Sequence, residues 1–197
     1  MHKSKFGDRF DAQIIRRDAL SGLYLVESLW TVEHLRRKAK GALYHWEPVA
    51  PPEVSHNVCT DEGLNALLDI MFHGDTQIGT WYVLIFESDT TPAAGTTYAT
   101  PVFTESTAYD EATRPAYDEA AASSKVMTNS ASKATFTISD TKTIYGGALV
   151  GGGSTPSTKG DAAGGGVLFC ASQFSTAKSV VDDDVLKVTV SITAADT

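Results

Sequence analysis

The spacing of apolar residues predicts one helix in an otherwise strand-like chain. Thr60 can cap this helix with its side-chain oxygen, and Asp61 and Glu62 place negative charge in the first turn, where the helix dipole favours it. We expect the helix over residues 61–73, with Gly74 ending it. Apolar residues spaced by three and four positions form a single stripe, which we expect to lie on a sheet. The stripe comprises Leu64, Leu67, Leu68, Met71 and Phe72.

After the helix the pattern changes to that of β-strands. Residues 81–86, WYVLIF, form a continuous apolar run that predicts a strand buried on both faces. Residues 134–140 alternate Phe136 and Ile138 with threonine and serine, which predicts one buried and one wet face. Three further runs complete the strands expected from residue 81 to residue 192: residues 143–150, 166–174 and 185–192.

A hairpin is expected upstream of the helix, over residues 29–49. Trp30 and its neighbours alternate in polarity, which favours a strand, although the same spacing also allows a helix. In the favoured interpretation Leu29–Leu35 pairs with Ala42–Val49, and the chain turns at Lys38–Gly41.

Together these elements predict a mainly β fold, an antiparallel β-sandwich of jelly-roll type with one short α-helix and an extended N-terminal arm. The sandwich domain is expected over residues 29–197 and the basic arm over residues 1–28. The start of the arm carries little periodicity, so it is either an extended segment that orders on a partner or a frayed terminus. Residues 87–132 and 151–166 are long irregular stretches, and such loops are usually functional or disordered.

Charge divides the 197-residue chain into a basic beginning and an acidic remainder. Residues 1–40 contain nine Lys and Arg against five Asp and Glu, whereas residues 41–197 contain seven against nineteen. The arm could contact an acidic protein surface or nucleic acid, but the acidic body would repel phosphates, so nucleic acid is not the expected partner. No apolar run approaches the ~20 residues of a membrane span, and the opening residues lack the apolar region of a signal peptide. We therefore expect no membrane contact and synthesis in a cytosol.

The candidate cofactor and metal motifs are incomplete. The glycine-rich residues 151–166 lack the order of a phosphate-binding loop, and no helix follows them. His56 and Cys59 have the spacing of half a zinc site, but the other thiol, Cys170, lies in a predicted strand. Two cysteines are too few for a disulfide scaffold, and a cytosol would keep both reduced. We expect neither a metal nor a cofactor.

Two carboxylate-rich segments do not amount to a predicted active site. Calcium ligands occupy alternating positions around a glycine bend, whereas Asp182–Asp184 are consecutive. We therefore expect these three side chains to fan outward in a solvated turn. Tyr-Asp-Glu-Ala occurs twice, from Tyr109 and from Tyr117, on either side of Arg114, which could pair with one of these four carboxylates. A glycosidase would need two carboxyls about 5–10 Å apart in a cleft, and no nucleophile motif is present. We therefore expect no catalytic residues.

Residues 56–86 contain a polar strand end, a Thr-Asp-Glu-Gly helix start, an apolar helix, a short glycine-containing loop and a Trp-Tyr strand, in that order. This pattern resembles a small family of tailed-bacteriophage virion structural proteins. The resemblance covers roughly residues 29–194. Later segments similar to the family are residues 108–117, 129–138, 143–150 and 180–192.

The resemblance implies a β-rich accessory protein of the virion, made in the bacterial host and without enzymatic activity. Two locations are consistent with it. A cement or decoration protein on the capsid surface bridges subunits of the major capsid protein, whereas a neck or tail accessory protein anchors a fibre, seals a ring or binds a host glycan. Either role implies a homo-oligomer or another symmetric assembly. Residues 1–28 and 151–166 depart from the family pattern and could form contacts that are specific to one kind of particle.

Residues that could contact a partner are concentrated near the N-terminus. Trp30, Tyr44 and Trp46 are candidate aromatic anchors, although core burial is an equal alternative for each. Positive charges would steer this region toward an acidic neighbour. The candidate charges are Arg16, Arg17, Arg36, Arg37, Lys38 and Lys40.

Overall fold

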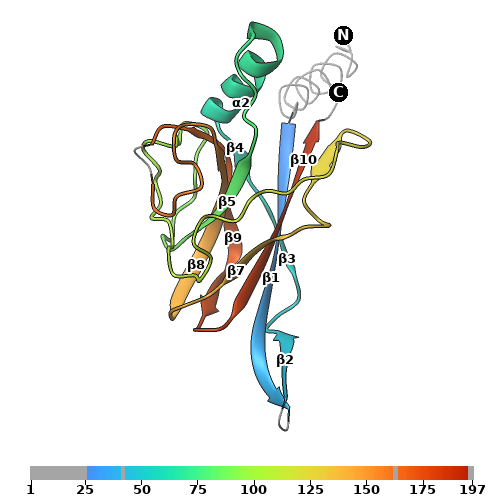
Figure 1. The fold of residues 1–197 in the computed structure, drawn as a ribbon, viewed down its shortest axis with the longest axis vertical. Coiled ribbons are helices and arrows are strands. Elements are labelled where there is room, and N and C mark those ends of the chain that lie inside the picture. The colour runs from blue at the N-terminus through green and yellow to red at the C-terminus, as the bar shows by residue number, and fades with distance from the viewer. Residues whose placement is uncertain (1–25, 41–42, 162–163, 195–197) are drawn as a thin grey trace, which may run out of the picture.

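The computed structural model describes residues 26–40, 43–161 and 164–194, which form two antiparallel sheets packed against each other (Figure 1). The prediction of a mainly β sandwich with one short helix is confirmed. The first sheet has the order β2 (Leu43–Pro48), β1 (Val26–Lys40), β10 (Val185–Ala194) and β6 (Val126–Thr128), with β3 (Glu53–His56) paired to β1 and β7 (Ala134–Thr137) paired to β10. The second has the order β4 (Val58–Cys59), β9 (Val167–Val180), β8 (Lys142–Gly151) and β5 (Trp81–Phe86).

The main core lies between the two sheets. Trp30 and Val32 project from β1 toward the second sheet, and both are buried. Their alternation with Thr31 and Glu33 is the period of two that places every second strand residue on one face. Burial stabilises each large apolar side chain by about 1.5–3 kcal/mol, so this cluster is the main source of folding energy. Other members are Val83, Ile85, Leu149, Cys170, Leu186, Val188 and Val190.

A second apolar cluster covers the opposite face of the second sheet. Leu84 and Phe86 of β5 face away from the first sheet, and Tyr98 and Phe103 from the long irregular stretch cover them. The rings of Phe86 and Phe103 stack with their centroids 4.5 Å apart. The prediction that residues 81–86 form a strand buried on both faces is therefore confirmed, with the last four residues fully enclosed.

Two consecutive glycines in β8 make room for aromatic rings on both faces of the second sheet. A Cβ atom at Gly147 would lie 2.7 Å from the ring of Trp30, and one at Gly146 would lie 2.1 Å from the ring of Phe86. Neither distance is compatible with a side chain. The pair of glycines in the sequence TIYGGALV therefore allows each core cluster to place an aromatic ring directly against the backbone of β8.

The helical segment begins and ends where predicted, but only part of its apolar stripe packs against the sandwich. Gly63 N donates a hydrogen bond of 3.0 Å to Thr60 Oγ1, which confirms the cap. The α-helix α2 (Asp61–Leu68) continues into one turn of π-helix, η1 (Asp69–His73), and Gly74 ends it with φ 88°. The first half of the helical segment is attached to the body, because Gly63 packs against the backbone of Phe169 and Leu67 packs against the main core. The end of the helix projects from the sandwich (Figure 1).

The hairpin upstream of the helix forms, with a different register. Leu35–Lys40 pairs with Leu43–Pro48, and Lys40 lies opposite Leu43, so the strand continues through the expected turn at Lys38. Leu29–Val32 pairs with β3 on one side and with β10 on the other, and not with the second half of the hairpin. β3 lies on the same edge of β1 as β2, so it occupies the part of that edge that a longer local hairpin would otherwise have used.

The expected boundary between arm and domain lies inside the first strand. Val26 is already opposite Ala194 in the ladder, and Ser28, which lies opposite Ile192, is buried. Residues 1–25, including the candidate charges Arg16 and Arg17, lie outside the described residues. The remaining irregular stretches agree with prediction, because residues 87–132 contain a single three-residue strand, β6, within the described chain.

Candidate interaction surfaces

One end of the sandwich carries an exposed hairpin. Beyond Leu35, β1 pairs with β2 alone, and the two strands extend past the rest of the first sheet (Figure 1). Tyr44 is 64% exposed and Trp46 is 48% exposed, although both are large and apolar. We name Leu43, Tyr44, Trp46 and Val49, all of them exposed, the hairpin surface. Aromatic side chains exposed in this way are typical anchors of protein–protein contacts.

A buried ion network fixes the base of this hairpin. Arg36 donates to both carboxylate oxygens of Asp184, from Nε at 2.8 Å and from Nη2 at 2.6 Å. His34 Nε2 lies 2.8 Å from Asp184 Oδ2, and the backbone N–H of Val181 donates to the same oxygen. The expectation that all three aspartates of the triplet are solvated is therefore wrong for Asp184, whose side chain is 1% exposed. This carboxylate joins β1 to the start of β10.

The charge of Asp184 depends on these partners. Burial by itself would raise the pKa of this carboxyl, but the hydrogen bonds from Arg36 and His34 outweigh that effect, and the pKa lies below its ordinary value. The hydrogen bonds to Asp184 favour the charged guanidinium of Arg36 more strongly than burial disfavours it, so the pKa of Arg36 is raised. Both groups are therefore charged at neutral pH, and their attraction holds the hairpin against the body.

The candidate contact charges divide into several groups. Arg36 is occupied by Asp184, and Arg37 donates to Asp183 at 3.0 Å while its guanidinium lies 4.0 Å from the centroid of the Tyr44 ring. Lys38 is exposed, and Lys40 lies in the strand, where only its backbone is described.

Trp30, the candidate aromatic anchor, is fully buried in the core, so it cannot contact a partner. Tyr44 and Trp46 remain available as anchors.

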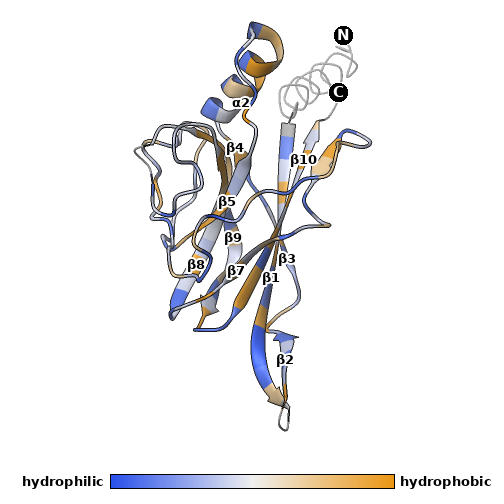
Figure 2. Cartoon of the chain, in the orientation of Figure 1, coloured by the Kyte–Doolittle hydropathy of each residue, from blue (hydrophilic) through white to orange (hydrophobic). Residues whose placement is uncertain are grey.

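The opposite end of the sandwich carries a second exposed apolar surface. Leu68, Met71 and Phe72 at the end of α2 and in η1 are exposed, and we name them the helix-end surface. Phe72 is 82% exposed and Met71 is 64% exposed. Leu67, by contrast, packs against the main core. Figure 2 shows this helix end in apolar colours, at the far end of the molecule from the hairpin. Contiguous exposed apolar side chains mark interaction sites.

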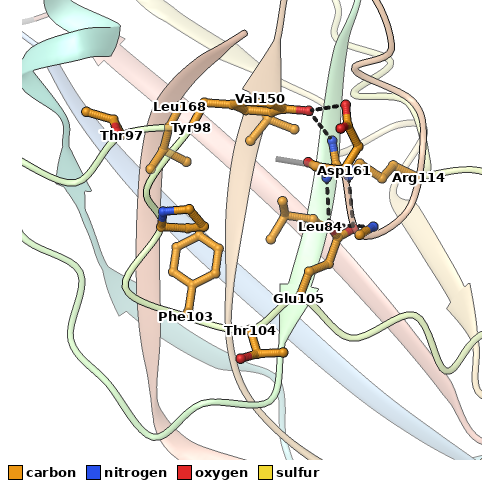
Figure 3. Close-up of a pocket in the computed structure, with 12 residues that line it drawn as sticks. Leu84, Thr97, Tyr98, Phe103, Thr104, Glu105, Arg114, Val150, Asp161 and Leu168 are labelled. Carbon is orange, nitrogen blue, oxygen red and sulfur yellow. Dashed lines mark hydrogen bonds and ion pairs between the residues drawn. The ribbon is translucent and has the colours of Figure 1, made fainter. Parts of the chain in front are cut away.

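A cavity of about 270 Å³ contains the only buried arginine of the described chain (Figure 3). Leu84, Phe103, Val150 and Leu168 form its apolar wall. Its polar wall combines a tyrosine with charged groups, as an active site would. The polar residues are Tyr98, Glu105, Arg114 and Asp161. Neither tyrosine of the Tyr-Asp-Glu-Ala repeat lines this cavity.

All five N–H donors of Arg114 have partners within the protein. Nε and Nη2 bind the two oxygens of Glu105 at 2.9 and 2.6 Å. The remaining donors bind the Tyr98 hydroxyl and the backbone oxygens of Pro156 and Asp161. Burial disfavours the charged guanidinium, but Glu105 more than compensates, so the pKa of Arg114 is raised. Arg114 therefore joins the two long irregular stretches, and its charge is neutralised within the cavity.

The Tyr-Asp-Glu-Ala repeat anchors the first irregular stretch to the sandwich. Tyr109 and Tyr117 are buried in the main core, and the Tyr117 hydroxyl donates to the backbone oxygen of Val190. The expected pairing of Arg114 with a repeat carboxylate is wrong, because its partner is Glu105. Glu111 accepts a hydrogen bond from the backbone of Thr137 instead. The two tyrosines and the Glu111 carboxylate of the repeat therefore all hold this stretch to the sandwich.

No three His, Cys, Asp or Glu side chains of the described chain gather closely enough to hold a metal ion. Among residues 26–40, 43–161 and 164–194, no helix has both the length and the apolar character that a membrane span requires.

A scan of the chain against protein-family models finds no match, and a comparison with curated proteins finds none either. The geometry of the surfaces therefore has to support a functional interpretation by itself.

We predict that Arg114→Met lowers the free energy of unfolding by about 3–5 kcal/mol, because it leaves the buried Glu105 carboxylate without its charged partner. The double variant Arg114→Met/Glu105→Met removes both charges and should lose less than the sum of the two single variants. Urea unfolding followed by tryptophan fluorescence measures all three values. Additive losses would contradict the direct coupling of these two residues.

We predict that Asp184→Asn destabilises the protein in a pH-dependent manner. Because the folded pKa of Asp184 is lowered, its contribution is complete above the pKa of an unfolded aspartate, about 3.9, and is lost as the pH falls through the folded value. The difference in unfolding free energy between wild type and variant should therefore be about 2–4 kcal/mol at pH 7 and shrink below pH 4.

Asp183→Asn is the matched control for this measurement, because Asp183 pairs with Arg37 at an exposed position. Exposed ion pairs contribute about 0–1 kcal/mol, so this variant should change stability little. An equal loss for the two variants, or a loss at Asp184 that persists undiminished at pH 3, would show that the buried network does not stabilise the fold as described.

Proposed function

We propose that this chain is a non-enzymatic structural protein of a bacteriophage virion, a cement or decoration protein that bridges subunits of the major capsid protein. The observation that carries the proposal is the placement of two exposed apolar surfaces at opposite ends of one sandwich (Figures 1 and 2). A protein that bridges neighbours needs two separate contacts. The resemblance of residues 29–194 to tailed-phage virion proteins supplies the identity of the neighbours.

Each surface is attached to the body in a way that suits a bridging role. The hairpin surface is held by the ion network of Asp184 with Arg36 and His34. The helix-end surface is held by the Thr60 cap and by the contact of Gly63 with the backbone of Phe169. The distance between the two surfaces is therefore set by the packed sandwich. A fixed spacing lets two individually weak contacts act together through their high effective concentration.

The polar cavity supports a structural role more than a catalytic one. Both oxygens of Glu105 are held by Arg114, and Oε2 also accepts from the backbone of Gly160. The donors of Arg114 are all used within the protein, so no charged group in this pair is left to act on a substrate. The cavity is best explained as the place where the two irregular stretches are joined.

We predict that Trp46→Ala and Phe72→Ala each weaken binding to capsid shells at least about tenfold, because each removes an exposed aromatic anchor. The shells are particles of the encoding phage assembled without this protein, to which the purified full chain is added back. Co-sedimentation measures binding, and thermal disruption of the shell measures its reinforcement. The double variant should neither bind nor protect the shell.

Val102→Ala is the matched control, because Val102 is 51% exposed but belongs to neither surface. It should bind as the wild type does, and circular dichroism should show that all variants fold. If both aromatic variants bind normally, the proposed surfaces are wrong. If only Trp46→Ala binds weakly, the protein is held at one end, which contradicts bridging.

A hollow beside the hairpin favours a second candidate, a neck or tail accessory protein that binds a host glycan. Tyr44, Asp182 and Asp183 line this hollow of about 290 Å³, and aromatic rings beside carboxylates are suited to sugars. Arg37 already covers one face of the Tyr44 ring, so a sugar could stack only on the other. Arg36, Arg37 and Asp184 complete its charged lining.

The bridging proposal predicts that glycans of the host envelope do not bind the isolated protein, as measured by calorimetric titration of the full chain. Binding that is lost in Tyr44→Ala and kept in Val102→Ala would favour the second candidate. The position of the protein in the particle separates the same alternatives, because a bridging protein occurs across the whole shell and an accessory protein of the neck or tail occurs in a single ring.

A further inference from the structure

The two cysteines of the chain are brought together by the second sheet. Cys59 in β4 and Cys170 in β9 are distant in sequence, yet they lie directly opposite each other in the antiparallel ladder. Both belong to the main core, where Cys170 is fully buried and Cys59 is partly buried against the same cluster. Side chains of directly opposite residues lie on the same face of a sheet, so the two thiols are neighbours.

The hydrogen-bond pattern places this pair at a favourable position for a covalent link. The backbone N–H of Thr60 donates to the oxygen of Phe169 at 3.0 Å, so Thr60 and Phe169 form a hydrogen-bonded pair. Hydrogen-bonded and non-hydrogen-bonded pairs alternate along an antiparallel ladder, which makes Cys59 and Cys170 a non-hydrogen-bonded pair. Cα atoms in such pairs are about 4.5 Å apart, and disulfides span Cα separations of about 4.4–6.8 Å.

The surroundings of the two sulfur atoms also indicate that they are close. Ser28 Oγ lies 3.7 Å from Cys59 Sγ, and the same hydroxyl interacts with the sulfur of Cys170. One small side chain therefore touches both thiols. Trp30 and Asn57 are further polar neighbours of Cys170. The charge that acts on Cys59 is the Glu27 carboxylate, which disfavours a thiolate and does not bind the sulfur.

We propose that Cys59 and Cys170 form a cross-strand disulfide when the protein meets a disulfide oxidant such as oxidised glutathione. The thiolate of the more accessible Cys59 attacks one sulfur of the oxidant, and one glutathione thiolate leaves. The thiolate of Cys170 then attacks Cys59 Sγ, and the second glutathione thiolate leaves. The two cysteines lose two protons and two electrons, which reduce one glutathione disulfide to two thiols.

This cross-link would stabilise the sandwich without altering its surfaces. It encloses about 110 residues, including α2, β5 and β8, and joins the short edge strand β4 to the central strand β9. Closing a long loop lowers the entropy of the unfolded chain, which stabilises the folded state. Burial raises the pKa of both thiols, that of Cys170 to about 12, so the exchange should be slow at neutral pH and faster at higher pH.

The full chain, purified in reductant, is incubated in a glutathione redox buffer, both folded and during refolding from urea, and free thiols are then alkylated. Mass spectrometry of peptides without reduction should find one intrachain link between Cys59 and Cys170. The oxidised protein should melt on the order of 5–15 °C above the reduced protein. The reduced wild type is the reference, so the comparison does not depend on a variant that folds.

Cys59→Ser and Cys170→Ala are the controls, and each should show the same melting temperature in oxidising and reducing buffers. The proposal is overturned by any of three results after refolding in the redox buffer: both thiols remain free, both carry stable glutathione adducts, or the link joins two different chains. An intrachain link that lowers the melting temperature would also overturn the stabilising role.

Discussion

The pairing of β1 with β10 is the interaction on which the rest of this structure depends. Ten consecutive residue pairs join the two strands, from Val26 opposite Ala194 to Leu35 opposite Val185. This ladder fixes which face of β1 points inward, and the inward face carries Trp30 and Val32 into the core. The same strand then leaves the sheet as one arm of the hairpin. A single long strand therefore connects the hydrophobic core to the hairpin surface, so the position of the surface follows from the packing of the core.

Buried charge determines how the irregular parts of the chain are held. A buried ion is costly unless it is paired and its hydrogen bonds are satisfied, and the structure satisfies both requirements at Arg114 and at Asp184. Arg114 joins two long stretches that contain little regular structure, with β6 the single strand within residues 87–132 of the described chain. Asp184 joins the hairpin to the turn before β10. In both places the charges that would otherwise be available for catalysis or for a partner are used to specify the conformation of the chain.

Both ends of the sandwich expose large apolar groups. The hairpin surface and the helix-end surface expose large side chains that a monomer would normally bury, and neither surface belongs to the core clusters. The arginines beside the hairpin are neutralised by Asp183 and Asp184, so hydrophobic contact outweighs charge there. If the chain bridges capsid subunits as proposed, its partner offers apolar pockets, with Lys38 adding electrostatic steering at the rim.

Local pattern was sufficient for the fold class, the helical segment and the longer strands, whereas the spacing around Trp30 left a helix open and the short strands β3, β4 and β6 were not predicted. Continuous and alternating apolar runs identified the main strands, and the Thr60 cap and Gly74 identified the ends of the helical segment. These signals are readable because strand and helix periods depend on neighbouring residues alone. One further signal was present but unused: His34 continues the buried alternation of Trp30 and Val32, and a histidine on a buried face requires a polar partner.

The amino-acid sequence alone identifies the longer apolar runs as strands, the start of the helix, and an acidic body rich in β-structure, but not the short strands β3, β4 and β6. Tertiary packing specifies which strands pair, that Trp30 is core while Trp46 is exposed, and that the second half of the helix stripe stays uncovered. It also specifies the partners of Arg114, and it brings Asp184 and the two cysteines to partners far away along the chain. The reason is physical: strand formation is a local property, whereas burial and pairing depend on which distant segment occupies the neighbouring edge or face.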